Sequence, residues 1–392
     1  MPHFESAPKY SEADPAQAAS QEHACGDPVP PYEDFQVKGL VRRDTERIFF
    51  DQAVINALGD GETIVNAERY GNSSWSATGK LTTKKSDGTL HDYFLKIIKG
   101  DLAGPRVLGE FACMKELEGA VPSLVPSAKA AGKCIDSEGA FFLCDYLEID
   151  HRPANPEQLG KKIAELHKAS VSPTGKFGFH LTPYDGKLPL AAEWDSSWTS
   201  FFTKLLSGVH QLDRKVNGPW PELDDAMELT LKTVIPRLLD RLTEDGREVK
   251  PCLIHGDLHE QNIGTELRTG NIYIFDSCAY YAHHEMAMGM WRVDHHHMKA
   301  REYRREYFKN YPPDEPQEEA DDRNRLYAIK EEIMYSAHVP GTKARAQALD
   351  DLKFLIEKYV EYEDSDEEED DDDESDATSS VDEKEFLVSH SK

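Results

Sequence analysis

The spacing of apolar residues divides the chain into a strand-rich part and a helical part. Residues 62–98 alternate between apolar and polar positions, with interruptions at Gly71–Ser74 and at "SDGT". This pattern predicts strands joined by hairpins. Next, "GPRVLGEFACMKELEG" has apolar residues at helical spacing and closes on Gly119, which predicts a helix. The apolar run "AFFLCDYLEI" predicts a further buried strand.

After this strand the apolar spacing becomes mainly helical. Helices are predicted at "PEQLGKKIAELHKAS", "WTSFFTKLLSGVHQL", "MELTLKTVIPRLLDRL" and "ALDDLKFLIEKYV". A chain of 392 residues is longer than one compact core usually spans. We therefore predict an α+β fold of two lobes, a small antiparallel-sheet lobe over residues 37–147 and a larger helical lobe over residues 148–360.

Both ends of the chain differ in composition from the part between them. Residues 1–36 are rich in Ala, Ser, Glu and Pro, which predicts a flexible tail. Residues 361–392 hold sixteen acidic residues and two lysines, half of the net charge of −28. Such a block repels itself, so we predict a disordered tail. The tail either serves as an interaction segment for a protein partner or a phosphorylation segment, with Ser365 and Ser375 as candidate sites, or only solubilises the chain. The remaining acidic body argues against a nucleic-acid partner, which needs a basic face.

The six cysteines are scattered and include no CxxC pair. This usage is typical of a reduced, intracellular protein. The N-terminal segment has no apolar signal core, and no apolar run approaches membrane-spanning length. We therefore expect a cytoplasmic protein without a membrane partner.

The stretch "LIHGDLHEQNIG" carries the strongest chemical signal in the chain. Asp257 follows a histidine and a glycine, and Asn262 comes five residues later. The short strand "NIYIFDS" then ends on Asp276 and would bring a second carboxylate beside this loop. Oxygen ligands of this kind suit Mg²⁺, which often binds through one or two carboxylates together with substrate phosphates. Each residue alone would be an ordinary turn residue, but the set predicts a catalytic loop.

The sheet-rich part supplies groups for a phosphate. Lys96 lies on an apolar strand and needs a partner there, because a buried unpaired ammonium is unfavourable. Glu110, on the helix that follows, is the predicted partner. The turn "YGNSSW" around Gly71 offers small residues whose backbone amides could approach phosphate oxygens, although such turns occur in many hairpins.

In this order, Lys96, Glu110, "HGDLHEQN" and "IFD" resemble the protein-kinase-like small-molecule kinases. The stretches "GKFGFH", "EWDSSWTSFF" and "AYYAHHEMAMGMWR" resemble the fructosamine-3-kinase, or ketosamine kinase, branch. The resemblance covers roughly residues 37–360. It implies ATP as phosphate donor, Mg²⁺ as cofactor, and transfer of a phosphoryl group to the O3 hydroxyl of ketosamines on amines or proteins. Phosphorylation makes the adduct unstable, so the amine is released.

The resemblance also assigns roles to individual residues. Asp257 corresponds to the catalytic base, and Asn262 and Asp276 to the Mg²⁺ ligands. Lys96 and Glu110 correspond to the ion pair that holds the phosphates. The nucleotide-binding positions also include the phosphate loop at Gly71, Asn72, Ser73 and Ser74 and the adenine hinge at Asp145, Tyr146 and Leu147.

One departure concerns the acceptor side of the loop. The family usually has Trp and a small residue after "HGDL", whereas this chain has His259, Glu260 and Gln261. A kinase of an aminoglycoside- or choline-like acceptor therefore stays open, as does a catalytically silent kinase-like binding module. His255 is predicted to brace the loop through hydrogen bonds. The aromatic residues Trp194, Trp198, Phe201 and Phe202 are predicted to form a helical core stripe, and a zinc site at His283, His284 and His295–His297 is disfavoured because no accompanying ligand set has zinc spacing.

Overall fold

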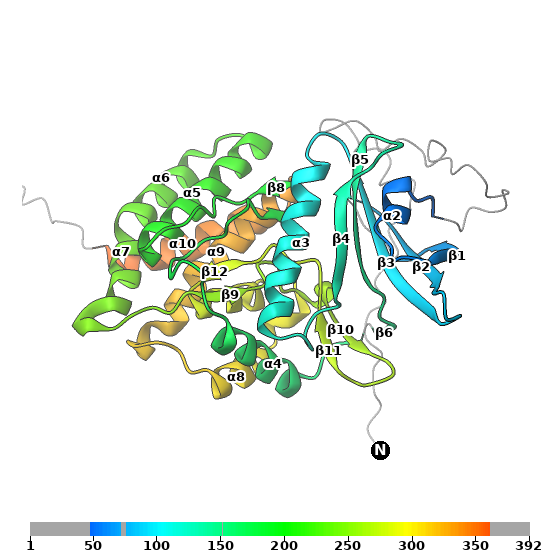
Figure 1. Cartoon of the computed structure of the whole chain (residues 1–392). Helices are drawn as coiled ribbons and strands as arrows, with labels where there is room; N and C mark the ends of the chain where they lie inside the picture. Colours follow the sequence, from blue (N-terminus) through cyan, green and yellow to red (C-terminus); the bar gives the residue numbers. More distant parts are fainter. Residues whose placement is uncertain (1–47, 72–75, 151, 361–392) are drawn as a thin grey trace, which may run out of the picture.

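The fold was taken from a computed structural model that describes residues 48–71, 76–150 and 152–360. Its first part is an antiparallel five-stranded sheet with the strand order β1-β2-β3-β5-β4 (Figure 1). The strands are β1 (Thr63–Arg69), β2 (Ala77–Lys84), β3 (Leu90–Lys99), β4 (Ala128–Lys133) and β5 (Gly139–Asp145). The hairpins predicted over residues 62–98 are confirmed, whereas the patterning did not predict β4.

Both faces of this sheet are covered. Successive side chains of a strand point to opposite faces. In β5, Phe142 and Cys144 face the core that contains α3 (Ala103–Ala120), while Phe141 and Leu143 face a smaller core behind the sheet. The smaller core includes the short helix α2 (Gln52–Asn56). Helix α3 thus lies between the sheet and the helical part of the molecule (Figure 1).

The second part is mainly helical. Asn155 caps the first of its helices and Ser197 caps the next, each through a side-chain oxygen that accepts a backbone N–H. The helices are α4 (Pro156–Ala169), α5 (Trp198–Asn217), α6 (Pro221–Leu229), α7 (Ile235–Leu239), α8 (Arg301–Asn310), α9 (Ala320–His338) and α10 (Ala344–Tyr359). The sequence pattern did not predict α8 and α9.

Two sequence predictions in this part need correction. The segment 227–242 was predicted as one helix, but a π turn at Thr230–Val234 separates α6 from α7. Pro236 lies just after this turn and has no N–H to donate to the preceding turn. The aromatic core stripe is right for Trp198, Phe201 and Phe202, which are buried on α5. Trp194 precedes the helix and packs near Tyr281, with ring centroids 6.0 Å apart.

Short strands position the loop that the sequence singled out. Residues 255–262 leave one small sheet and enter another. The pairs are β9 (Cys252–Ile254) with β12 (Tyr280–Ala282), β10 (Ile263–Glu266) with β11 (Ile272–Ile274) and β6 (Ile149–Asp150), and β7 (Tyr184–Asp185) with β8 (Leu188–Pro189).

The α+β fold with a small antiparallel sheet and a larger helical part is confirmed. The domain boundaries stay predictions, and both predicted tails, residues 1–36 and 361–392, lie outside the described residues. Within the described ranges no helix is long and apolar enough to cross a membrane. The described cysteines are free thiols, and Cys113, Cys144, Cys252 and Cys278 are buried, as small apolar side chains often are.

Candidate active site

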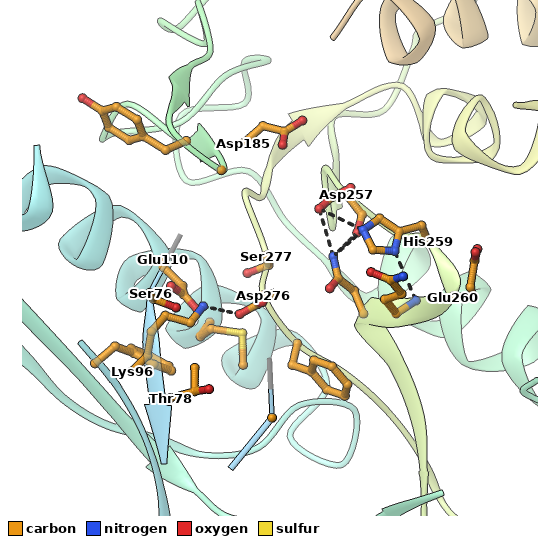
Figure 2. Close-up of a pocket in the computed structure, with 18 of the residues that line it drawn as sticks. Ser76, Thr78, Lys96, Glu110, Asp185, Asp257, His259, Glu260, Asp276 and Ser277 are labelled. Atoms are coloured by element: carbon orange, nitrogen blue, oxygen red, sulfur yellow. Dashed lines mark hydrogen bonds and ion pairs between the residues drawn. The ribbon is translucent and has the colours of Figure 1, made fainter. Parts of the chain in front are cut away.

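A cavity of about 1060 Å³ lies between the sheet and the helical part. Its lining comes from the cleft face of β2, β3 and β5, from α3 and α9, and from the loops around residues 257 and 276 (Figure 2). The described part of the predicted site lines this single cavity: Gly71, Lys96, Glu110, Asp145, Tyr146, Leu147, Asp257, Asn262 and Asp276. Asn72, Ser73 and Ser74 lie outside the described residues.

Lys96 connects the sheet to the helix and to the second loop. Alternation along β3 places it on the cleft face, where its side chain is 9% exposed. Its Nζ donates to Glu110 Oε1 at 2.7 Å and also contacts the carboxylate of Asp276 (Figure 2). Burial alone would lower the pKa of Lys96, but the charges of Asp276 and Glu110 outweigh burial and raise it. Lys96 is therefore a fixed cation between two carboxyl groups.

The two carboxyl partners of Lys96 differ in charge. Burial raises the pKa of Glu110 to about 7, against the opposing charge of Lys96. For Asp276, burial also acts to raise the pKa, but the Lys96 ammonium and its hydrogen bond lower it overall. Asp276 is thus the carboxylate that stays ionised near neutral pH, as a ligand of a divalent cation must be.

The loop that carries Asp257 is held by its backbone and by His255. Gly256 has φ +87°, and a Cβ there would lie 2.3 Å from the carbonyl oxygen of Cys278, so only glycine fits. His255 Nε2 donates to Phe275 O at 2.9 Å, and His255 Nδ1 accepts the Asp257 N–H at 3.3 Å. Burial lowers the pKa of His255 to about 4, so the neutral ring can make both bonds. The predicted bracing role of His255 is confirmed.

Asn262 fixes the orientation of Asp257. Its Nδ2 donates to both the backbone O and the Oδ2 of Asp257, each at 2.9 Å. The same Oδ2 lies 3.5 Å from His259 Nε2. Burial acts to raise the pKa of Asp257, but the hydrogen bond and charge of His259 lower it to about 2. Asp257 is therefore an ionised carboxylate whose Oδ2 is occupied by contacts with Asn262 and His259.

Asp276 stands in a backbone conformation that is uncommon for aspartate. Its φ is +58°, in the left-handed region that side chains other than glycine rarely adopt. The preceding Phe275 donates its N–H to Asn262 O at 3.1 Å and accepts the bond from His255, so the two loops are tied together. Outliers of this kind concentrate at functional sites.

The hinge segment has its first two backbone donors occupied. The N–H of Asp145 donates to Ser127 O, and that of Tyr146 to Asp92 O, both at 3.0 Å. The Asp145 carboxylate pairs with His91 at 3.0 Å, and Lys80 lies 4.5 Å from the centre of the Tyr146 ring. The side chains of Asp145 and Tyr146 are therefore used within the sheet, which leaves their backbone carbonyls and Leu147 for a ligand.

The sequence prediction missed two groups of lining residues. Ser76, which precedes β2, and Thr78, the second residue of β2, stand beside Lys96 on the cleft side (Figure 2). Their two-residue spacing could have predicted that both side chains lie on one face of the strand, because side chains on the same face recur at every second residue. The second group forms the far wall: Tyr184 and Asp185 of β7, and Glu331, Met334, Tyr335 and His338 of α9.

His259 faces both Asp257 and a second histidine. Its Nδ1 accepts the Gln261 N–H at 3.1 Å, so Nε2 carries the proton toward Asp257. Its ring stacks on His296, with centroids 5.1 Å apart and planes 5° apart. The ring at this position therefore keeps the stacking capacity of an aromatic residue while adding a hydrogen-bond donor.

Two clusters of described residues meet the distance criterion for a metal site. In the first, ligand atoms of His259, Glu260 and His296 lie within 4.8 Å of one another. A metal binds imidazole in the ring plane, and these two rings are stacked in separate, nearly parallel planes, so their in-plane lone pairs cannot meet at one ion. In the second, Glu285 is paired with Arg323 at 2.8 Å, and His283 and His284 each bond a tyrosine hydroxyl at 2.9 Å. These contacts favour hydrogen-bonded clusters, in line with the sequence interpretation.

A family model described as fructosamine kinase matches residues 52–360. The chain belongs to the fructosamine kinase family. It is 29% identical over 167 residues to a chloroplastic protein-ribulosamine 3-kinase of Arabidopsis thaliana, covering 42% of this chain and 48% of the relative. It is 25% identical over 183 residues to a ketosamine-3-kinase of Mus musculus, covering 40% of this chain and 56% of the relative. The chain thus spans about half the length of these curated relatives.

Solved structures show the same fold. A protein described as a fructosamine-3-kinase from Haemophilus somnus superposes with a TM-score of 0.60 at 16% identity, covering 78% of this chain and 96% of that one. Another from Thermobifida fusca gives a TM-score of 0.59 at 19% identity, with 76% and 95% covered. The predicted bilobal, kinase-like architecture and the predicted family are confirmed.

Proposed function

We propose that this protein is an ATP-dependent kinase that phosphorylates O3 of ketosamines, either as small molecules or attached to proteins. The observation that carries the proposal is the convergence of Lys96, Glu110 and Asp276 with Asp257 and Asn262 in one cavity. Ketosamines are the acceptor class named for the Mus musculus relative, and ribulosamines on proteins are named for the plant relative.

The nucleotide would occupy the side of the cavity formed by the sheet. The hinge at residues 145–147 would hold adenine through backbone atoms, and Lys96 would hold the phosphates. Gly71, with φ +75°, lines the same side and provides a position where a backbone can approach a phosphate closely. Asn72, Ser73 and Ser74 stay predicted members of this phosphate loop.

The residues present fit a magnesium ion. Asp276 is ionised, and Asn262 binds Asp257 through Nδ2, so its side-chain oxygen remains for a ligand. A carboxylate and an amide oxygen together with phosphate oxygens are a typical Mg²⁺ ligand set. The ion would supply neutralisation of the charge that develops on the transferred phosphoryl group.

Asp257 would act on the acceptor. Because Asn262 and His259 engage Oδ2, Oδ1 is the oxygen available to a bound hydroxyl. As that hydroxyl oxygen bonds to the γ-phosphorus, its proton passes to Asp257, the bond to the β-phosphate oxygen breaks, and ADP leaves. With a pKa near 2, Asp257 mainly orients the hydroxyl, which is the usual part of such an aspartate in phosphoryl transfer.

An acceptor panel tests the proposal. The full-length protein with ATP and Mg²⁺ would be offered fructosyl and ribulosyl amines, a glycated protein, free sugars, aminoglycosides and choline, and phosphate transfer would be measured. We expect transfer to the glycated amines in preference to the others. Transfer to an aminoglycoside or amino alcohol alone would replace the acceptor while keeping the kinase, and no transfer to any compound would support a silent binding module. The cytoplasmic location and a protein partner for the acidic tail stay predictions.

A further inference from the structure

The wall of the cavity opposite the sheet carries carboxyl groups that the phosphate chemistry does not use. Helix α9 presents Glu331, Met334, Tyr335 and His338 to the cavity at positions i, i+3, i+4 and i+7, one face of a helix. Across from it, β7 contributes Asp185, which His338 Nε2 contacts at 3.1 Å. Figure 2 shows Asp185 on its own strand end, apart from the loop that carries Asp257.

Glu331 is placed where a charged group is costly. Its side chain is only 6% exposed, and its Oε2 accepts from Lys330 Nζ at 2.9 Å. Burial raises its pKa to about 7 against the effect of Lys330, and the charges of Asp185 and Asp257 raise it further. All three carboxyl groups line the same cavity. Lys330, itself fully buried, is the cation paired with Glu331.

One histidine of this wall, His295, adds no positive charge near pH 7. Burial and the neighbouring His296 lower the pKa of His295 to about 4, so this ring is neutral near pH 7. Glu260, also in the lining, has its pKa lowered to about 2: burial opposes this shift, but the hydrogen bond from His296 outweighs it. The acceptor side of the cavity therefore gathers negative charge, which a bound cation would relieve.

We propose that Glu331 and Asp185 form the subsite that binds the protonated amine of the acceptor, next to the hydroxyl held by Asp257. The inference rests on the proposed function and names the group that selects the acceptor. In a ketosamine the amine and O3 are separated by three carbons, so the amine must bind close to the base. Tyr335 and Met334, beside Glu331 on the same face, offer apolar surface to the carbon chain of the amine.

Helix α9 supplies a matched control. Glu332 is the next residue, its side chain is equally buried at 6% exposed, and burial likewise raises its pKa to about 7. Glu332 does not belong to the cavity lining. Besides burial, the charges that raise its pKa are mainly those of Asp294 and Asp351, with a smaller contribution from Glu331. Glu331→Gln and Glu332→Gln therefore make the same chemical change on and off the proposed subsite.

The experiment measures kcat and KM of the full-length protein for two acceptors in the presence of ATP and Mg²⁺. One is a fructosyl alkylamine, and the other is its ether analogue, with oxygen in place of the NH. We expect the wild type to prefer the amine by lowering its KM, and Glu331→Gln and Asp185→Asn to raise that KM on the order of 10- to 100-fold, the range for a charge-assisted hydrogen bond. The KM for ATP, the KM for the ether and the Glu332→Gln variant should change little.

Each outcome has a definite meaning. Equal use of amine and ether by the wild type overturns the subsite without any variant, so a folding defect in Glu331→Gln cannot hide the answer. An amine preference that survives in both Glu331→Gln and Asp185→Asn overturns the assignment to these residues. A wild type that phosphorylates neither compound overturns the proposed function and, with it, the subsite.

Discussion

The two sides of the cavity are built in different ways. On the nucleotide side, Lys96, Glu110 and Asp276 form a buried ion-paired cluster, and Asn262 and His255 hold the Asp257 loop from within. On the acceptor side, the lining comes from α9, the β7–β8 hairpin and residues 295–297, which are far apart in the sequence. In the proposed function, phosphate chemistry would thus rest on short motifs, whereas acceptor recognition would rest on a surface assembled by the fold.

This difference indicates which side of the cavity can tolerate substitutions. The nucleotide side has little freedom, because a buried charge without its partner is strongly destabilising. The acceptor side contains His259, where the family usually has Trp, and this histidine still stacks on His296. Changes on the two sides should therefore have different consequences: loss of turnover or stability on one, and altered acceptor KM on the other.

The largest effect is expected from Asp257→Asn. The variant keeps the shape of the side chain but removes the charge that orients the hydroxyl, so kcat should fall on the order of 10²- to 10⁴-fold. ATP binding, measured by calorimetry in the presence of Mg²⁺, should persist. Near-normal turnover would remove Asp257 from the mechanism.

Lys96→Met should lower stability as well as activity. It leaves Glu110 and Asp276 without their cation, and breaking a buried pair typically costs about 3–5 kcal/mol of unfolding free energy. Lys80→Met is the matched control, because the Lys80–Asp92 pair on β2 and β3 lies nearer the surface and is not in the cavity lining. That change should cost about 0–1 kcal/mol in denaturant unfolding. Equal losses for the two variants would contradict the distinction drawn for Lys96.

Glu332 behind the acceptor wall should make stability depend on pH. Its folded-state pKa of about 7 is raised above the usual value of 4.5, so the folded state holds this proton more tightly than the unfolded state. The resulting stability is fully present below pH 4.5 and is lost as pH rises through 7, by roughly 3 kcal/mol at most. Measured by urea unfolding, the free energy of unfolding should fall less between pH 5 and pH 8 for Glu332→Gln than for the wild type. An unchanged difference would show that Glu332 is not buried in its neutral form.

The smallest effect is expected from His259→Trp. The change restores the residue type usual in the family and keeps a stacking ring, but it removes the imidazole beside Asp257 Oδ2. We expect the acceptor KM to shift by about fivefold, corresponding to one weak hydrogen bond, with little change in the KM for ATP. His259→Gln, which can still donate to Asp257, should lie closer to the wild type. A larger change in the KM for ATP than in the KM for the acceptor would place His259 on the nucleotide side.

The nucleotide side could be predicted because its residues carry local signals. Lys96 stands out as a charge on an apolar strand, and Asp257 and Asn262 have a fixed spacing within one loop. Period-two alternation then places Lys96 on the cleft face, and the register of β2 with β3 puts Thr78 opposite it. Local pattern was enough to find these groups, although their roles in catalysis stay proposals.

The acceptor side could not be predicted in the same way. Glu331 lies in "KEEIMYSAH", where neighbouring Glu332 looks equivalent, and only the packing of α9 decides which carboxyl group meets the cavity. Asp185 belongs to a two-residue strand that no periodicity marks. Trp194 was assigned to a helix because its spacing matched, but Ser197 caps the helix and Trp194 remains outside it. Such features depend on tertiary contacts rather than on the local sequence.

The most direct test of the account is the fate of the γ-phosphate of labelled ATP when the full-length protein is mixed with a ribulosyl or fructosyl amine and Mg²⁺. The account predicts that label appears on O3 of the ketosamine, located by phosphorus–proton NMR, and that Asp257→Asn abolishes this signal while still binding ATP. Label on another hydroxyl, transfer that does not depend on Asp257, or release of phosphate without any phosphorylated ketosamine would contradict it.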